Sequence, residues 1–356
     1  MTTRVYLRSP DGAETVRDIG NGYWLEPEGT AGQVIGQDMY ALPGLSDGHA
    51  HFAAPVGQDW QSDAYDDAVR RARLALQAGV LLALDKGWSN NFTVRIIDTV
   101  PPLERPDIEA AGIINAVKDG YWPNFARELD QVGFDEGINQ SLDDSRGWIK
   151  FVGDWPRRGQ GPVANFSQEE LAKAVAAAEA VGSRVAIHTM ARDAPSMAVR
   201  AGVHSIEHGL FLTEEDLNEL GGRGGMWVPT ILRMEAVVTQ LGPESSGGKL
   251  ILEGLDNLRH LLPLAAEAGV HLLAGTDVTV GAHDVALEAQ RLVDYGLPVD
   301  RALEAVSSEA YRATGRPHAF EVGSPANAVF FPANPLEEFE VLTSPRMVLR
   351  LGELVT

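Results

Sequence analysis

The sequence has no cysteine among its 356 residues. Disulfide bonds, thiolate metal ligands and a cysteine nucleophile are therefore excluded. Any metal ion that the protein binds must be held by nitrogen and oxygen atoms, which leaves zinc, manganese, iron, cobalt and nickel as candidates.

Basic residues are few, and long apolar runs are missing. Lysine and arginine number 29 against 50 aspartates and glutamates, a net charge of −21, which repels the phosphate groups of nucleic acids and of anionic membranes. No run approaches the roughly 20 apolar residues that would span a bilayer, and residues 1–12 lack the apolar core of a secretory signal. We therefore expect a soluble cytoplasmic protein that acts on a small molecule and binds no nucleic acid or membrane.

Two kinds of pattern divide the chain. Residues 1–41 and 323–356 contain short strand-like runs separated by turn residues, which predicts one small β-sandwich domain built from both ends. Residues 42–322 alternate apolar runs with helical patterns, and eight such runs predict a (β/α)8 TIM barrel. The runs are the one before His49, GVLLALD (79–85), DIEAAGII (107–114), GWIKFV (147–152), RVAIH (184–188), HSIEH (204–208), GMWVP (225–229) and HLLAG (271–275).

Local signals add detail to the predicted barrel. Ser167 and Glu170 form a capping-box pattern that predicts a helix ending near Val181. Two connections, 115–147 and 231–249, are longer than minimal turns, so we expect both to be loops over the mouth of the barrel.

Several potential metal ligands stand at the ends of the apolar runs. His49 and His51 are two residues apart, so both side chains point the same way in an extended chain. Lone polar residues occupy similar positions further along, at Lys150, His188, His208 and Asp277. Because the carboxyl ends of barrel strands meet at one face, these six side chains are predicted to converge. The remaining histidines are expected to be structural, except that His283 follows Asp277 and could reach the pocket; the structural ones are His204, His260, His271 and His318.

With these motifs in place, the sequence resembles the amidohydrolase superfamily of metal-dependent hydrolases. The segments PGLSDGHAH, IEHG and GTD are similar to its signatures for strands one, six and eight, and the imidazolonepropionase-like and Xaa-Pro dipeptidase-like subgroup shares them. The resemblance implies two divalent metal ions, with zinc expected first. It assigns His49, His51 and Asp277 to one ion and His188 and His208 to the other. Lys150 would bridge them, which requires a carbamate because an ammonium group has no lone pair.

The resemblance also implies a reaction. A hydroxide shared by the two metals would attack an amide-type carbon–nitrogen bond in a dipeptide, an N-acyl amino acid or a related amide, and Asp277 would carry the proton to the leaving nitrogen. We expect basic residues of the loops to hold a substrate carboxylate and aromatic residues to form an apolar wall. The residues concerned are Lys118, Arg157, Arg158 and Arg233, with Tyr121, Trp122 and Trp155.

Other functions remain open at this point. The same centre could hydrolyse a carbamate, a urea, a cyclic amide or a lactone. A mononuclear deaminase is disfavoured, because such relatives carry a glutamate three residues after the strand-five histidine, where this chain has Ala191. A non-catalytic scaffold is disfavoured by the complete ligand set, and a homo-oligomer is neither required nor excluded. Two places depart from the family pattern: the end of the second strand, Asp85-Lys86-Gly87-Trp88, where relatives often have an Arg-Asp pair, and Asn327, where they usually have Asp. The first departure could alter the floor of the pocket.

Overall fold

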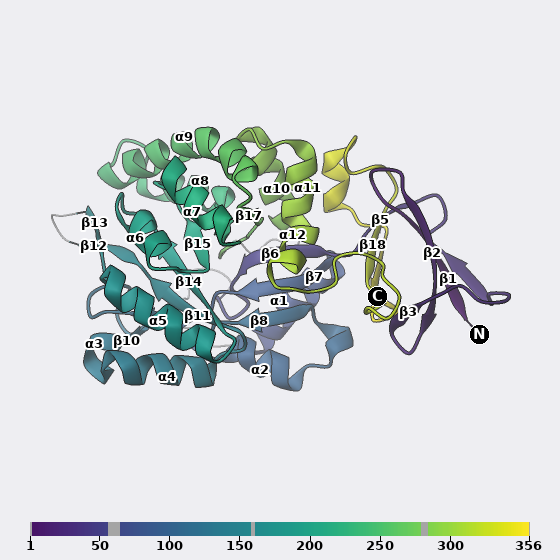
Figure 1. The fold of residues 1–356 in the computed structure, drawn as a ribbon, viewed down its shortest axis with the longest axis horizontal. Helices are drawn as coiled ribbons and strands as arrows, with labels where there is room; N and C mark the ends of the chain where they lie inside the picture. The colour runs from purple at the N-terminus through teal and green to yellow at the C-terminus, as the bar shows by residue number, and fades with distance from the viewer. Residues whose placement is uncertain (1, 56–64, 158–160, 279–283, 356) are drawn as a thin grey trace.

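The computed structural model describes residues 2–55, 65–157, 161–278 and 284–355. A large unit of helices and strands fills most of the molecule, and a smaller sheet lies at the end where both chain termini are found (Figure 1). Two residues that the sequence suggested for substrate binding, Arg158 and His283, fall outside the described ranges. None of the helices within those ranges is long and apolar enough to cross a membrane.

Each of the eight predicted apolar runs contains a strand, and these strands run parallel to their neighbours. They form two sheets, with the order β6-β7-β8 in one and β10-β9-β11-β14-β15-β16-β17 in the other. The strands are β6 (Leu45–Ala50), β7 (Val80–Asp85), β8 (Asp107–Ala110), β9 (Asn115–Ala116), β10 (Arg127–Glu128), β11 (Trp148–Val152), β14 (Arg184–Thr189), β15 (Ser205–His208), β16 (Met226–Val228) and β17 (His271–Leu272).

A few backbone contacts connect the two parallel sheets at both edges. Ala110, at the end of β8, bridges to Gly147, just before β11. At the other edge, the N–H of Gly48 in β6 donates to the carbonyl of Ala274, which follows β17, at 2.7 Å. The fold is therefore α/β and TIM-barrel-like, although the eight strands are hydrogen-bonded as two sheets and not as one.

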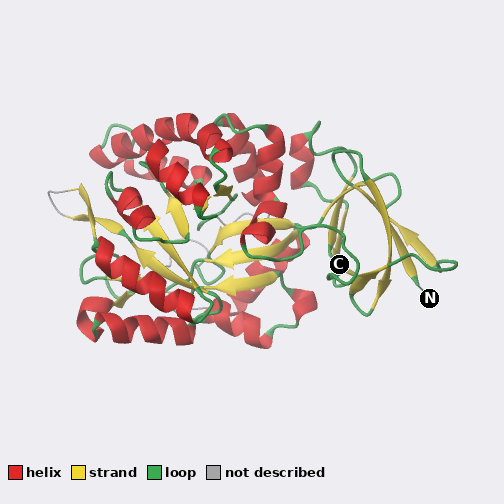
Figure 2. Cartoon of the chain, in the orientation of Figure 1, coloured by secondary structure: helices red, strands yellow, loops and turns green. Residues whose placement is uncertain are grey.

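Helices cover the outside of these strands (Figure 2). The capping box predicted at Ser167 is confirmed, because its hydroxyl accepts from the N–H of Glu170 at 3.2 Å and its own N–H donates to the Glu170 carboxylate at 2.8 Å. The helices are α1 (Tyr65–Gln77), α2 (Phe92–Thr99), α3 (Leu129–Val132), α4 (Phe134–Asp144), α5 (Gln168–Ala180), α6 (Ala194–Arg200), α7 (Glu214–Gly222), α8 (Ile231–Leu241), α9 (Ser246–Glu267), α10 (Asp284–Asp294), α11 (Val299–Val306) and α12 (Ser308–Ala313).

Neither connection that was expected to be a loop is one throughout: 115–147 contains β9, β10, α3 and α4, and most of 231–249 is helical. Ile231, Met234 and Val238 are buried on one side of α8, and their spacing of three and four residues is that of a helix face. The polar segment LGPESSGGK had suggested a flexible loop, but it supplies only the short turn between α8 and α9 together with the first turn of α9.

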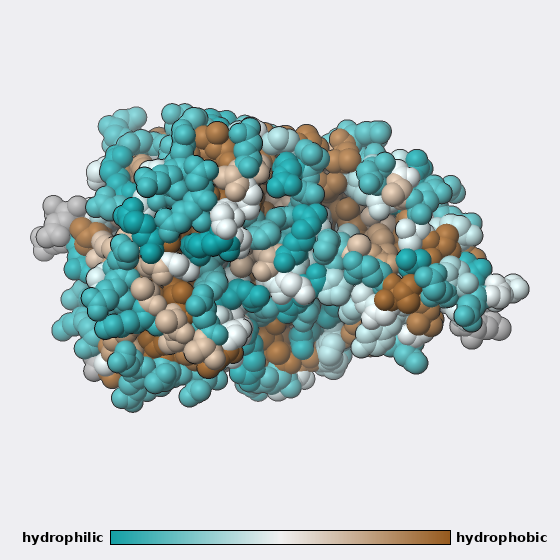
Figure 3. Space-filling view, in the orientation of Figure 1, coloured by the Kyte–Doolittle hydropathy of each residue, from teal (hydrophilic) through white to brown (hydrophobic). Residues whose placement is uncertain are grey.

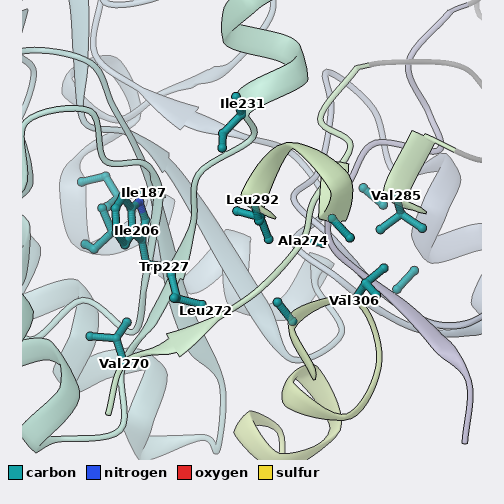
Figure 4. Close-up of a cluster of buried hydrophobic side chains, with 14 of the residues drawn as sticks. Ile187, Ile206, Trp227, Ile231, Val270, Leu272, Ala274, Val285, Leu292 and Val306 are labelled. Atoms are coloured by element: carbon teal, nitrogen blue, oxygen red, sulfur yellow. The ribbon is translucent and has the colours of Figure 1, made fainter. Parts of the chain in front are cut away.

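Neighbouring residues along the parallel strands belong alternately to two hydrophobic cores. Ile187 and Trp227 belong to the large core between strands and helices, part of which is drawn in Figure 4. Their neighbours Ala186 and Met226 belong to a smaller core that also contains Trp148. Successive residues of a strand point to opposite faces. One set therefore packs under the helices, and the other packs on the inner side of the parallel strands.

The smaller sheet contains strands from near both ends of the chain. Its order is β20-β19-β18-β5-β1-β2-β3, with β4 paired to β1, so the expected sandwich of two sheets is instead one hydrogen-bonded sheet. Val329 and Phe331 of β18 pack into the large core, whereas Phe330 packs within the small sheet. The strands are β1 (Thr3–Arg8), β2 (Glu14–Gly20), β3 (Tyr23–Leu25), β4 (Gln33–Ile35), β5 (Tyr40–Leu42), β18 (Ala328–Phe331), β19 (Met347–Arg350) and β20 (Glu353–Leu354).

The surface is predominantly hydrophilic on the face drawn in Figure 3, with apolar side chains in scattered patches. The outer surface thus agrees with the excess of acidic residues in the composition.

Candidate metal centre and pocket

The first group of potential ligands comes from β6 and from the segment after β17. The Nε2 atoms of His49 and His51 lie 3.1 Å apart. The Oδ1 atom of Asp277 lies 3.4 Å from Nε2 of His51 and 4.0 Å from Nε2 of His49. One atom from each of these three side chains can therefore bind the same ion, since all three lie within 4.8 Å of one another.

The second group comes from β14 and β15. Nδ1 of His188 lies 2.9 Å from Nε2 of His208, and the ring of His208 is 5.5 Å from that of His49. Lys150, at the middle of β11, lines the same cavity. Nζ of Lys150 and Nε2 of His188 are buried and have no hydrogen-bond partner within the described part of the chain. All six side chains that the sequence singled out are thus brought together.

Three residues at the strand ends have left-handed backbone conformations that side chains other than glycine rarely adopt. The φ angles are +63° for His208, +50° for Thr230 and +55° for Asp277. Such conformations cost energy and persist where the surroundings fix them, frequently at functional sites. Thr230 is tied to the site directly, because its Oγ1 lies 2.6 Å from Nδ1 of His208.

A buried carboxylate holds the loop that carries Asp277. Asp47, in β6, accepts hydrogen bonds from the hydroxyl of Thr276 at 2.6 Å and from the backbone N–H of His49 at 3.0 Å. The N–H of Asp277 donates to the carbonyl of His49 at 2.7 Å. These bonds fix the first and last members of the ligand set relative to each other, although 228 residues separate them in the chain (277 − 49).

Burial sets the charge state of these groups. It lowers the pKa of His49 to about 4 and that of His188 to about 3, and it lowers the pKa of Lys150 to about 8. For Asp277 burial alone would raise the pKa, but the hydrogen bond from His51 and the charge of His49 hold it well below its ordinary value. At neutral pH His49, His188 and His208 are therefore neutral and Asp277 is ionised, the forms that bind metal.

The donor set fits a divalent metal. Ring nitrogens point at one another across 2.9 to 3.1 Å, and Nζ of Lys150 and Nε2 of His188 are buried without a hydrogen-bond partner in the described part of the chain. A cation among these nitrogens would relieve the cost of burying them. With only nitrogen and oxygen donors, the site suits zinc and its first-row neighbours.

A cavity of about 350 Å³ opens over the ligand set. Its wall is largely apolar, and Trp88, Tyr121, Trp122 and Trp155 form its aromatic side. The rings of Tyr121 and Trp155 are 4.6 Å apart, and that of Trp122 is 5.3 Å from Trp155. Tyr121 therefore lines the pocket, as the sequence suggested.

The basic residues proposed for the mouth separate into two kinds. Arg233 of α8 lines the cavity, and its Nε lies 3.9 Å from Oδ2 of Asp277. Arg157 is exposed on the hairpin of β12 (Asp154–Arg157) and β13 (Gly161–Ala164), where it donates to Oδ1 of Asn165 at 3.2 Å. Neither Arg157 nor Lys118 is among the described residues that line the cavity. The hairpin contributes Trp155 instead of its arginine.

Two charged residues beneath the site were not identified as functional from the sequence. Glu207 of β15 is fully buried, and its Oε2 lies 2.6 Å from Nδ1 of His49. Lys86 is also fully buried, with Nζ 3.3 Å from Oε1 of Glu207. In a regular strand Glu207 and His208 would face opposite sides, but the left-handed backbone of His208 turns its side chain to the site as well. The signal in the sequence that could have identified Lys86 was the pair Asp85-Lys86, because it departs from the family pattern.

Asp85 itself is structural and does not line the cavity. Its carboxylate accepts from the N–H groups of Phe52 at 2.7 Å and Gly87 at 2.9 Å and from the hydroxyl of Thr93 at 3.0 Å. The carbonyl of Gly87 in turn lies 2.5 Å from Nδ1 of His51. The departure from the family pattern at Asp85 therefore does not alter the pocket floor directly. The Asp85 carboxylate instead supports the loop that orients His51.

Most of the other histidines are placed away from the cavity, where the sequence expected structural roles. Three of them contact glutamates: His271 lies 2.6 Å from Glu309, His260 lies 3.1 Å from Glu214, and His204 lies 3.4 Å from Glu179. His318 is exposed near the small sheet.

The fold and the site together define an α/β protein with a histidine-rich candidate metal site beside parallel strands. Comparison with known proteins gives the family. The model of the amidohydrolase family matches residues 40–355, so the chain belongs to that family and is a hydrolytic enzyme acting on carbon–nitrogen bonds. The family that the sequence motifs indicated is confirmed.

Individual relatives extend this comparison. An uncharacterized protein of Mycobacterium tuberculosis is 30% identical over 324 residues, which cover 88% of this chain and 84% of the relative. The ochratoxinase of Aspergillus niger is 29% identical over 199 residues, covering 52% of this chain and 40% of that protein. A Xaa-Pro dipeptidase crystal structure with bound methionine superimposes with a TM-score of 0.85 at 22% identity, covering 99% of both chains. This last similarity is one of fold.

The lowered pKa values predict how the metal-free protein responds to acid. His188 has a folded pKa of about 3, below the ordinary value of 6.5, so between these values the unfolded chain binds a proton that the folded chain does not. Stability is therefore lost as the pH falls below about 6.5, by about 2 kcal/mol for this histidine at pH 5. Urea unfolding at pH 7.5 and pH 5 should show a smaller loss in His188→Asn than in wild type. Equal losses would contradict a neutral His188.

Proposed function

We propose that the enzyme hydrolyses a small amide, such as a dipeptide or an N-acyl amino acid, with two divalent metal ions held by the six converging residues. The observation that carries this proposal is the pair of unpartnered buried nitrogens, Lys150 Nζ and His188 Nε2, beside the His49, His51 and Asp277 group. His49, His51 and Asp277 would hold one ion, and His188 and His208 the other. When bound, the ions would activate water and polarise the scissile carbonyl group.

Lys150 fits between the two groups only as a carbamate. A buried ammonium group without a partner is costly, and it repels a neighbouring metal ion. Its pKa of about 8 increases the fraction of neutral amine, which is the form that adds carbon dioxide. Carboxylation would convert the lysine into an anion whose two oxygens can bind one ion each.

Asp277 is the residue placed to move a proton. One of its oxygens faces His51, and the other lies on the side of Arg233 and the cavity. In the proposed reaction this carboxylate accepts the proton of the attacking water and delivers it to the nitrogen that leaves. Its left-handed backbone and the bond to the carbonyl of His49 hold the carboxylate in place for both transfers.

The lining of the cavity supports a substrate with an apolar part and one anionic group. Trp88, Tyr121, Trp122 and Trp155 provide a broad aromatic wall. Arg233 and Lys150 are the cationic side chains among the described residues that line the cavity, and Lys150 is assigned to the metals. Arg233 can therefore bind a substrate carboxylate and orient the scissile bond. A carbamate, urea, cyclic amide or lactone would use the same centre without needing this arginine.

A deaminase receives less support. Ala191, at the position where deaminases of this fold carry a glutamate, is a buried alanine with no group that could transfer a proton. Lys150 would have no role at a mononuclear centre, yet it is buried within the ligand set.

Metal analysis tests the binuclear centre. We expect close to two divalent ions per chain in the purified wild-type protein and a large loss of metal in Lys150→Ala, with partial recovery when a short carboxylic acid is added. Lys173→Met, which changes an exposed lysine, should keep the full content. A fully loaded protein with one ion per chain and an unmodified Lys150 would contradict this centre.

Replacing the proton-carrying residue tests the reaction. Asp277→Asn keeps an oxygen that can bind metal but cannot accept the proton, so kcat should fall by about 100-fold or more while much of the metal remains. Steady-state kinetics and metal content measured on the same preparation separate the two effects. Wild-type kcat in Asp277→Asn would show that another group moves the proton.

Matched substrates test the carboxylate contact. Arg233→Ala should lower kcat/KM by about 10- to 100-fold for an N-acyl amino acid, the effect of losing a hydrogen bond to a charged group, and should change little for the corresponding ester or amide of its carboxyl group. Arg157→Ala is the control, because this exposed arginine does not line the cavity. If Arg233→Ala affected both substrate forms equally, a neutral amide, carbamate or lactone would be favoured.

A further inference from the structure

A buried ion pair lies beneath the proposed metal centre, outside the cavity. Lys86 follows the last residue of β7, and Glu207 is in β15, so the pair connects strands of the two parallel sheets. Both side chains are fully buried, and neither lines the pocket. A surface ion pair would require no further explanation, but this one places two charges where desolvation is expensive.

Three groups lie close to the two carboxylate oxygens of Glu207, one by a hydrogen bond and two by short ion-pair distances. Oε1 lies 3.3 Å from Nζ of Lys86 and accepts a hydrogen bond from the hydroxyl of Ser205 at 2.6 Å. Oε2 lies 2.6 Å from Nδ1 of His49. A proton on Nδ1 of His49 is thereby favoured, which leaves Nε2 with its lone pair on the side of His51 and Asp277.

Lys86 has few partners besides Glu207. Its ammonium group lies 3.8 Å from the centre of the Trp148 ring, a cation–π contact, and it has no other ion pair within 4.0 Å among the described residues. Burial lowers the pKa of Lys86, and the charge of Glu207 opposes that effect. Lys86 and Ser205 thus bind one oxygen of Glu207 and leave the second oxygen for His49.

We propose that Lys86 is a positioning residue for the metal centre: its ammonium group fixes the Glu207 carboxylate against Nδ1 of His49 and so aims Nε2 of His49 at the first metal site. This inference rests on the proposed function, since it assumes that His49 binds metal. It assigns a role to the position where the sequence departs from the family pattern.

The first experiment uses the metal-free protein and a double-mutant cycle. Lys86→Met leaves a buried carboxylate without its cation, and Glu207→Gln leaves a buried ammonium without its anion, so each should lower Tm. The double variant Lys86→Met with Glu207→Gln removes both charges and should be less destabilised than the two single changes added together. Additive effects in the cycle would overturn the pairing.

The histidine spectrum reports the orientation of His49 before any metal is added. In wild-type protein labelled with 15N-histidine, Nδ1 of His49 should carry the proton. Lys86→Met should change the His49 signals, whereas Lys173→Met, which removes a lysine from an exposed pair with Glu169, should not. Unchanged His49 signals in Lys86→Met would overturn the proposed positioning.

Metal binding completes the test. Lys86→Met and the double variant should both bind zinc about 10- to 100-fold more weakly than wild type in a chelator competition, the range found for changes in groups that support metal ligands. KM for the substrate should stay unchanged in loaded Lys86→Met, because Lys86 does not line the cavity. If the double variant recovers stability but not zinc affinity, the result supports a role of Lys86 in positioning His49. Wild-type zinc affinity in Lys86→Met contradicts that role.

The outcomes separate the two proposals. A wild-type protein that binds no divalent metal would contradict the proposed function, while the cycle and the His49 signals, both recorded without metal, still decide whether Lys86 positions His49.

Discussion

The site depends on several charged side chains that lie close together among apolar residues on the inner side of the parallel strands. Lys86, Lys150, Glu207 and Asp277 lie within the same region as the ligand histidines, and burial acts against every charge there. Such charges are tolerated only when each has a partner. Glu207 meets this condition through Lys86 and His49, and the proposed metal ions would meet it for the remaining ligands.

The supporting interactions form a second layer around the ligands. Thr230 contacts His208, Gly87 contacts His51, and Glu207 contacts His49. Each of these contacts engages Nδ1 and leaves Nε2 facing the site. A consistent choice of ring nitrogen in three histidines from two strands is the arrangement expected of metal ligands whose orientation is fixed by neighbouring groups.

The pocket combines the candidate metal ligands with residues from other parts of the chain. The candidate ligands lie in or shortly after the parallel strands, whereas Tyr121 lies between β9 and β10, Trp155 in β12 and Arg233 in α8. Connections at the carboxyl ends of strands can vary without disturbing the barrel. Under the proposed function, the specificity of this chain would depend on these residues, which neither the fold nor the candidate metal centre dictates.

The sequence by itself determined the strands, the six converging side chains and the family, because alternating apolar runs and polar residues at their ends are local patterns. It misjudged residues 231–249, where polar turn residues concealed the helical spacing of Ile231, Met234 and Val238. Only the tertiary structure showed that Arg233 reaches the cavity and Arg157 does not, or that Lys86 and Glu207 meet beneath His49. Such contacts depend on how distant segments are brought together, and Lys86 and Glu207, which are 121 positions apart (207 − 86), have no local signal of their pairing.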